Sequence, residues 1–268
     1  MANILPTRLP GDSEDSAEGR MSFFDHLSEL RKRIVNSLIG IGVGAVIGLL
    51  ISKRFIQFIT TPMLKALAAN HLDQNLYYTS PAGYISLVIN LGIYIGIVLA
   101  MPYVLYQIWL FVAPGLYKTE KRAFTSFVTF GTLLFACGLA FAYFILLPRT
   151  LTFLMGFAND GPVKPLISIN EYFSLILIIL LGMGLIFEMP IVIYILSLFG
   201  LVTPKFLLKN FRYAMLLITV AAAIITPTPD ATTMLVFMMP MVGLYFVSVL
   251  VSYVVVRKKR AKEAAAAA

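Results

Sequence analysis

The stretch YFSLILIILLGMGLIFEMPIVIYILSLFGLV, residues 172–202, is almost entirely apolar and carries one formal charge, the carboxylate of Glu188. About 20 residues of helix cross the roughly 30 Å hydrocarbon core of a bilayer, so the stretch predicts a membrane-spanning helix. A charge at mid-bilayer costs on the order of 2.5–3.5 kcal/mol on insertion scales. Glu188 is therefore a candidate functional group that lines a cavity or faces a partner. The alternative is a structural glutamate buried in protein.

The composition of the whole chain agrees with a membrane protein. Of its 268 residues 59% are hydrophobic and 13% charged, whereas soluble domains are about 45–50% apolar and about 25% charged. In this setting the net charge of +8 does not indicate nucleic-acid binding. Cys137 is the single cysteine, and His26 and His71 form no motif. No nucleotide loop, metal-ligand cluster or nucleophile set is visible, so we expect no metal, no cofactor and no enzyme.

Further apolar runs predict additional spans. Five runs are long enough to cross a bilayer, and a shorter one, YAMLLITVAAAII at 213–225, is counted as a short span because the charge pattern requires it. The expected fold is an all-α integral membrane protein with six transmembrane helices, the last two of them short. The expected spans are residues 34–52, 84–111, 123–147, 172–200, 213–225 and 233–255.

The distribution of basic residues predicts the orientation of these spans. With six spans and an inside N-terminus, most of the 21 lysines and arginines fall in inner segments, so both termini are expected in the cytoplasm. The outer loops hold a Pro62-containing helix at 54–69 and a continuation of the third span past Leu147, which together form an extracytoplasmic cap. The expected organisation is a disordered tail at 1–20, a membrane domain at 21–256 and a basic, alanine-rich tail at 257–268.

Two glutamates on the cytoplasmic side have local explanations and a functional one. Glu29 can pair with Lys32 or Arg33 along its own helix. Glu120 follows Thr119, a suitable N-cap for the third span. Its negative charge would also interact favourably with the dipole at the N-terminus of that helix. Alternatively, the two carboxylates converge on a ligand with paired positive charges, because the planar arginine fork matches a carboxylate better than lysine does.

Five motifs, in this order and at these spacings, resemble the TatC family, the polytopic receptor subunit of the twin-arginine protein translocase. The likeness covers about residues 22–255. The motifs are HLSELRKR at 26–33, PYVLYQIWLFVAPGLYKTEKR at 102–122, FAYFILLP at 141–148, FEMP at 187–190 and TPTPD at 226–230. The resemblance implies a receptor for the twin-arginine signal peptides of folded precursors. It also implies TatB and TatA as single-span partners in a hetero-oligomer of several copies, driven by the proton-motive force across the bacterial inner membrane.

The resemblance also implies roles for individual residues. Glu29 and Glu120 would accept the arginine pair, and Arg31 belongs to the same motif. Glu188 matches the polar group of the family's concave membrane face. The residues that would shape the peptide site are Phe111, Pro114 and Tyr117, and the marked positions of the outer loops are Pro62 and Asp230.

The chain departs from the family pattern at two positions. Met234 stands where many relatives have a glutamine, and Phe246 is nearest to the position of a glutamate in their sixth span. Two other functions stay open on the residues alone. An ion-coupled small-molecule transporter would use Glu188 as its proton carrier, although no internal repeat is visible. A purely structural scaffold would need neither Glu29 nor Glu120.

Overall fold

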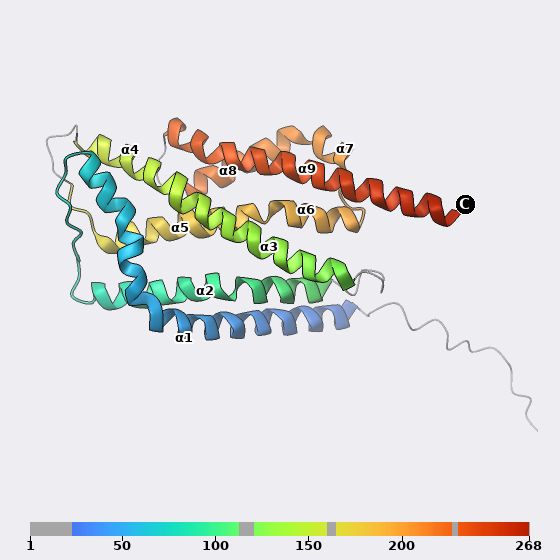
Figure 1. The fold of residues 1–268 in the computed structure, drawn as a ribbon, viewed down its shortest axis with the longest axis horizontal. Coiled ribbons are helices and arrows are strands. Elements are labelled where there is room, and N and C mark those ends of the chain that lie inside the picture. The colour runs from blue at the N-terminus through green and yellow to red at the C-terminus, as the bar shows by residue number, and fades with distance from the viewer. Residues whose placement is uncertain (1–22, 113–120, 160–164, 227–229, 268) are drawn as a thin grey trace, which may run out of the picture.

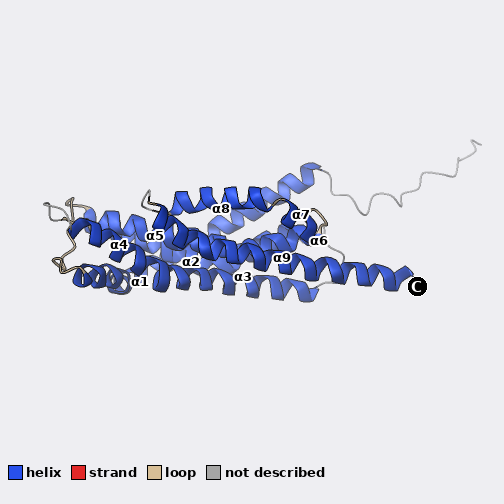
Figure 2. Ribbon diagram, turned by 90° about the horizontal axis from the view of Figure 1, so that it is seen from above, coloured by secondary structure: helices blue, strands red, loops and turns tan. Residues whose placement is uncertain are grey.

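The computed structural model describes residues 23–112, 121–159, 165–226 and 230–267, and the regular structure in these ranges is helical (Figures 1 and 2). One isolated parallel bridge, between Tyr77 and Ser168, joins two connecting segments. This confirms the expected all-α class. The elements are α1 (Phe23–Ala69), α2 (Gly83–Val112), α3 (Lys121–Phe141), the π-helix η3 (Ala142–Leu146), α4 (Leu147–Asn159), α5 (Ile169–Phe187), α6 (Met189–Leu198), α7 (Pro204–Lys209), α8 (Phe211–Ile225) and α9 (Ala231–Ala267).

Five helical stretches are long and apolar enough to cross a membrane, and they coincide with five of the six predicted spans. The sixth predicted span is α8, which has only 15 residues. At about 1.5 Å per residue it is shorter than a bilayer core. The long stretches are His26–Ala69, Gly83–Val112, Phe127–Phe157, Ile169–Leu198 and Ala231–Ala261.

Helices α1 and α2 lie side by side (Figure 1) and are in backbone contact at four glycines. A Cβ atom at Gly44 would lie 2.5 Å from the carbonyl oxygen of Gly96, and one at Gly48 would overlap the carbonyl oxygen of Gly92. Small residues four apart on both helices permit this close approach. The outward face of α1 is apolar and exposed, as expected for a lipid-facing surface; it includes Ile34, Leu38, Ile39, Val46 and Leu50.

The predicted outer helix at 54–69 is helical, but it is the continuation of α1, which bends sharply between its bundle part and its end (Figure 1). Pro62 lies in this outer part and has no N–H to donate to the Phe58 carbonyl one turn earlier. The Tyr143 hydroxyl donates to that carbonyl at 2.6 Å instead. The outer part of α1 is therefore tied to the π-helix η3 through the group that the proline leaves free.

The third span continues past Leu147 as helix α4, as predicted. Its hydrogen-bond ladder widens in η3, where the Leu147 N–H donates to the Ala142 carbonyl. Pro148, one position on, has no N–H for the Phe144 carbonyl, so the α-helical pattern cannot run through this point unchanged.

The fourth predicted span is broken between α5 and α6 at Pro190, which has no N–H to donate to the carbonyl one turn earlier. Glu188 occupies the junction, and its N–H donates to the Leu185 carbonyl at 3.1 Å. Beyond the junction α6 packs against α9, where the buried Ser197 and Ser252 hydroxyls lie 2.9 Å apart. The largest apolar core is built from the end of α1, η3, α4, α5, α7, α8 and α9, and α6 packs against it with partly buried side chains.

The last helix is not short, so that expectation is wrong for α9, which has 37 residues. It starts with a side-chain cap, because Oδ2 of Asp230 accepts the Thr233 N–H at 2.7 Å. It then runs past Val255 through the basic segment to Ala267. Lysine, arginine and alanine are strong helix formers, so the helix extends beyond the apolar run that sets the length of the span.

Candidate functional site

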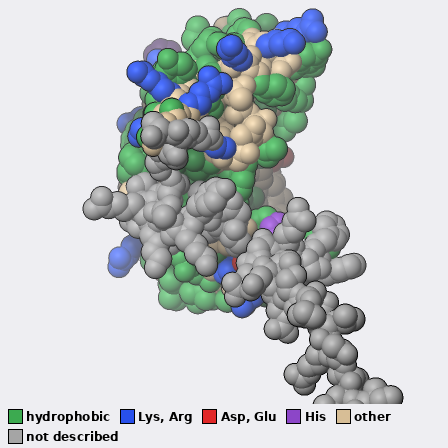
Figure 3. All heavy atoms as spheres, turned by 90° about the vertical axis from the view of Figure 1, so that its right-hand side faces the viewer, with side chains coloured by type: hydrophobic (Ala, Val, Ile, Leu, Met, Phe, Trp, Pro, Cys, Tyr) green, Lys and Arg blue, Asp and Glu red, His purple; other side chains and the backbone are tan. Residues whose placement is uncertain are grey.

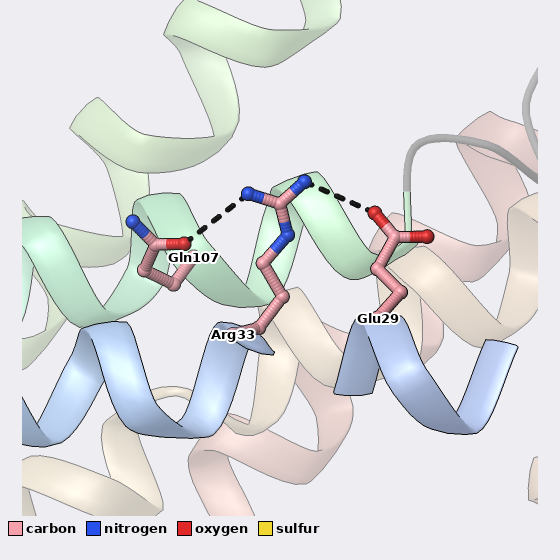
Figure 4. Close-up of polar contacts among 3 residues, drawn as sticks. All are labelled: Glu29, Arg33 and Gln107. Atoms are coloured by element: carbon pink, nitrogen blue, oxygen red, sulfur yellow. Dashed lines mark hydrogen bonds and ion pairs between the residues drawn. The ribbon is translucent and has the colours of Figure 1, made fainter. Parts of the chain in front are cut away.

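The Glu29 carboxylate is held by an arginine that bridges α1 and α2 (Figure 4). Nη2 of Arg33 donates to Oε1 of Glu29 at 3.0 Å, one helical turn away. Nη1 of Arg33 donates to Oε1 of Gln107, on α2, at 3.4 Å. The local pairing of Glu29 with Arg33 that the sequence allows is thus present, with an additional link to α2.

In this cluster one carboxylate oxygen of Glu29 accepts no hydrogen bond from a described residue. The side chain of Glu29 is 14% exposed and that of Arg33 22%, while Gln107 is buried. Oε2 of Glu29 is buried and has no hydrogen-bond partner among the residues that the structure describes. A partly desolvated carboxylate oxygen without a donor is a favourable site for an incoming cation, because the cost of removing it from water is already met.

Phe111, a residue that the resemblance assigns to the peptide site, contacts the start of α1 through His26. Its ring stacks on the His26 imidazole with the centroids 4.5 Å apart, and His26 precedes Glu29 by about one helical turn. Arg31 is on the same helix and exposed. The other predicted contacts, Pro114, Tyr117 and Glu120, lie outside the described residues, so the convergence of Glu29 and Glu120 stays a prediction.

Glu188 occupies a separate, deeper position. It is 7% exposed, and neither carboxyl oxygen has a hydrogen-bond partner within the described part of the chain. A Cβ atom at Gly131 of α3 would lie 3.3 Å from Oε2, so the absence of a side chain there makes room for the carboxyl. Glu188 therefore lies against α3, beside Leu105 of α2 and Ile191 of α6.

The two positions predicted in outer loops have backbone roles in this structure, and Pro62 lies within helix α1 and not in a loop. Pro62 is buried and frees the carbonyl to which Tyr143 donates. Asp230 caps α9 through the Thr233 N–H. Neither residue contributes to the cluster around Glu29.

Gln107 is the site residue that the sequence reasoning missed. It is the only amide or charged side chain between Met101 and Val112, and that isolation in an apolar run was the available signal. His26 was set aside because it forms no motif with His71, and its stacking on Phe111 depends on the α1–α2 contact.

The end of the bundle that carries this cluster is basic. Figure 3 faces the end where α1 begins and α9 ends, and lysine and arginine side chains gather there, above all over α7 and the end of α9. Among the described residues no group of three or more histidines, cysteines, aspartates or glutamates is placed to hold a metal ion.

Comparisons with known proteins agree with this arrangement. The family model described as Sec-independent protein translocase protein (TatC) matches residues 25–240. A TatC protein of Koribacter versatilis is 43% identical over 93% of this chain and 91% of its own length. The TatCy protein of Bacillus subtilis is 36% identical over 92% and 94%.

A solved structure, titled as the crystal structure of the twin arginine translocase receptor TatC, superposes with a TM-score of 0.75 at 34% identity. The match covers 86% of this chain and 99% of that one. These proteins are components of a protein-transport system in a membrane, where TatC works with other translocase subunits, and they are not a family of catalytic enzymes. Because the family model matches most of the chain and the identities extend over nearly its full length, this protein belongs to the TatC family of Sec-independent protein translocase proteins.

Proposed function

We propose that this chain is the signal-peptide receptor and core subunit of a twin-arginine translocase. It binds the twin-arginine motif of folded precursors for export driven by the proton-motive force. The observation that carries the proposal is the state of Glu29, whose Oε1 is held by Arg33 while its buried Oε2 has no partner among the described residues. A ligand guanidinium supplies the missing donor.

Arginine fits this carboxylate better than lysine for a geometric reason. A guanidinium is planar and directs several N–H groups at fixed angles, so it can donate to Oε2 and to a neighbouring acceptor together. A lysine ammonium supplies a point charge without that direction. In the proposed complex Glu120 receives the second arginine, Arg31 adjoins the motif, and Phe111, Pro114 and Tyr117 shape the peptide site.

The proposed setting is the bacterial inner membrane, with six spans and both termini in the cytoplasm. Residues 21–256 form the membrane domain, and α8 is the short sixth span. The concentration of lysine and arginine side chains at the end that holds Glu29 supports this orientation, because basic residues favour the cytoplasmic side (Figure 3).

The proposed partners are TatB and TatA, in a complex of several copies. Within the membrane Glu188 marks the groove along which the apolar part of the signal peptide or a partner helix lies. Its burial without a hydrogen-bond partner among the described residues supports a role for a polar contact at this depth.

A peptide-binding experiment with the full chain in lipid nanodiscs tests the proposal. A photo-crosslinking signal peptide is compared with the same peptide carrying two lysines in place of its arginines. We expect the arginine peptide to bind at least about tenfold more tightly, and Glu29→Gln to lose most of that difference, since hydrogen bonds to charged groups contribute about 1.5–3 kcal/mol.

Glu171→Gln provides a matched control. It removes an exposed carboxylate in the first turn of α5, outside the Glu29 cluster, and should leave both affinities unchanged. Equal labelling by the two peptides, or an unchanged preference in Glu29→Gln, would contradict the receptor proposal.

A further inference from the structure

A second polar site lies between the start of α7 and the end of α9, away from the Glu29 cluster. It is a hollow of about 310 Å³. Lys205 lines it from α7, and Tyr253, Arg257 and Arg260 line it from α9. The three α9 residues are four and three positions apart, so they form one stripe along the helix.

The cations of this hollow have no counter-charge among the side chains that the structure describes, which do not include that of Glu263 on α9. Lys205, Arg257 and Arg260 are exposed, and none makes an ion pair or hydrogen bond with a described side chain. None of the described residues that line the hollow is an aspartate or a glutamate. Lys259, also on α9, adds positive charge near the segment that leads into α7, because its Nζ lies 3.9 Å from the point that a Cβ atom at Gly200 would occupy. The site thus concentrates positive potential that an external anion would neutralise.

The same hollow joins an apolar, outward-facing surface. Pro204 and Val256 contribute apolar walls. On the same helix, Leu250 and Val254 are 66% and 50% exposed, two turns and one turn before Arg257 respectively. Both lie in the stretch Ala231–Ala261, which is apolar enough to cross a membrane. The hollow is therefore where a membrane-crossing surface becomes basic, the level at which lipid headgroups lie.

From these observations we propose that the hollow binds the phosphate of an anionic glycerophospholipid in the leaflet on the side of the C-terminus. The Arg257 and Arg260 guanidinium groups donate to the phosphate oxygens from α9, and Lys205 approaches from the opposite wall. The Tyr253 hydroxyl donates a further hydrogen bond. The acyl chains lie along Leu250 and Val254, and this apolar continuation is the reason for a lipid and not a soluble phosphate.

Native mass spectrometry of the full-length chain, titrated with phosphatidylglycerol, tests this site. Parallel titrations use phosphatidylcholine and inorganic phosphate. We expect phosphatidylglycerol to bind more tightly than phosphatidylcholine, and the double variant Arg257→Gln/Arg260→Gln to bind it roughly thirtyfold more weakly, at about fivefold for each lost charge near the membrane surface. Lys205→Gln alone should weaken binding about fivefold.

The double variant Lys209→Gln/Lys258→Gln is the matched control, because it removes the same net charge from exposed residues that do not line the hollow. It should retain wild-type affinity. If the control variant binds phosphatidylglycerol as weakly as Arg257→Gln/Arg260→Gln does, binding depends on overall surface charge and not on this hollow. If phosphatidylcholine binds as tightly as phosphatidylglycerol, the anionic charge of the lipid is not recognised. Inorganic phosphate binding as tightly as the lipid would assign the site to a soluble anion. Each of these three outcomes overturns the proposal.

Discussion

Arg33 divides its guanidinium between two helices: one amino group lies 3.0 Å from Oε1 of Glu29 and the other 3.4 Å from Oε1 of Gln107. A guanidinium that faced Glu29 alone could donate to both carboxylate oxygens. Here Gln107 holds the second amino group, so Glu29 is fixed by one bond and keeps Oε2 for another donor. Arg33 and Gln107 are thus positioning residues of the proposed receptor site.

Arg33→Lys should weaken binding of a twin-arginine peptide and reduce the preference for arginine over lysine. Lysine keeps the charge but lacks the fork that reaches both partners, so Glu29 loses its fixed orientation. We expect a loss of about fivefold to tenfold in affinity, equivalent to roughly 1 kcal/mol. Isothermal titration calorimetry or fluorescence anisotropy measures the affinity for each peptide. Lys32→Arg, at an exposed neighbouring position, should leave both affinities unchanged. A uniform loss for both peptides would indicate a merely structural role.

Glu188→Gln should keep most of the transport activity, and Glu188→Lys should abolish it. The amide has nearly the same shape, and Gly131 leaves the space that the side chain needs. The lysine places a positive charge and a longer side chain into a buried position. Uptake of a twin-arginine precursor into membrane vesicles is the measurement. An inactive glutamine variant would assign a titrating role to Glu188.

Gly48→Ala should destabilise the chain strongly, whereas Gly42→Ala on the same helix should not. A Cβ atom at Gly48 would overlap the Gly92 carbonyl oxygen and lie 2.9 Å from the Gly96 nitrogen, while one at Gly42 meets nothing within 4 Å. Overpacking of this kind costs about 1–3 kcal/mol. Thermal unfolding in detergent compares the two variants; equal melting temperatures would show that α1 can move away from α2 without loss.

Tyr143→Phe should destabilise the outer part of the fold by about 1–3 kcal/mol, because the Phe58 carbonyl loses its donor. Pro62→Ala restores a backbone N–H at the position that normally serves this carbonyl. The double variant should therefore lose less stability than the sum of the two single changes. A double-mutant cycle on unfolding free energies measures this coupling, and strict additivity would rule out the proposed exchange of donors.

The sequence predicted those features that depend on local pattern. Apolar run length located the long helices. The break at Glu188 also has a local cause, because the missing N–H of Pro190 acts on its own helix whatever surrounds it. The length of α9 was underestimated, since membrane hydropathy measures the span and not the helix, which continues through residues with strong helix propensity.

Long-range partners were beyond local reasoning. Arg33 and Gln107 are 74 positions apart in the chain, and nothing in either segment specifies which face of α2 meets α1. For the same reason the depth of Glu188 followed from its apolar surroundings, but its packing against Gly131 did not. The glycines of α1 and α2 are visible in the sequence, yet their register against one another appears only in three dimensions.

The glycine contact between α1 and α2 also limits how these two helices can move relative to each other. Gly44 and Gly48 contact the backbone of α2 at Gly92 and Gly96, and the Leu49 side chain packs against Gly92, so little side-chain bulk separates the two helices. Arg33 and Gln107 clamp the same pair near one end, and α1 continues from there as unbroken helix into the outer segment tied to Tyr143. We therefore expect α1 and α2 to move together, so that a ligand pulling on Glu29 would displace the pair and not α1 alone.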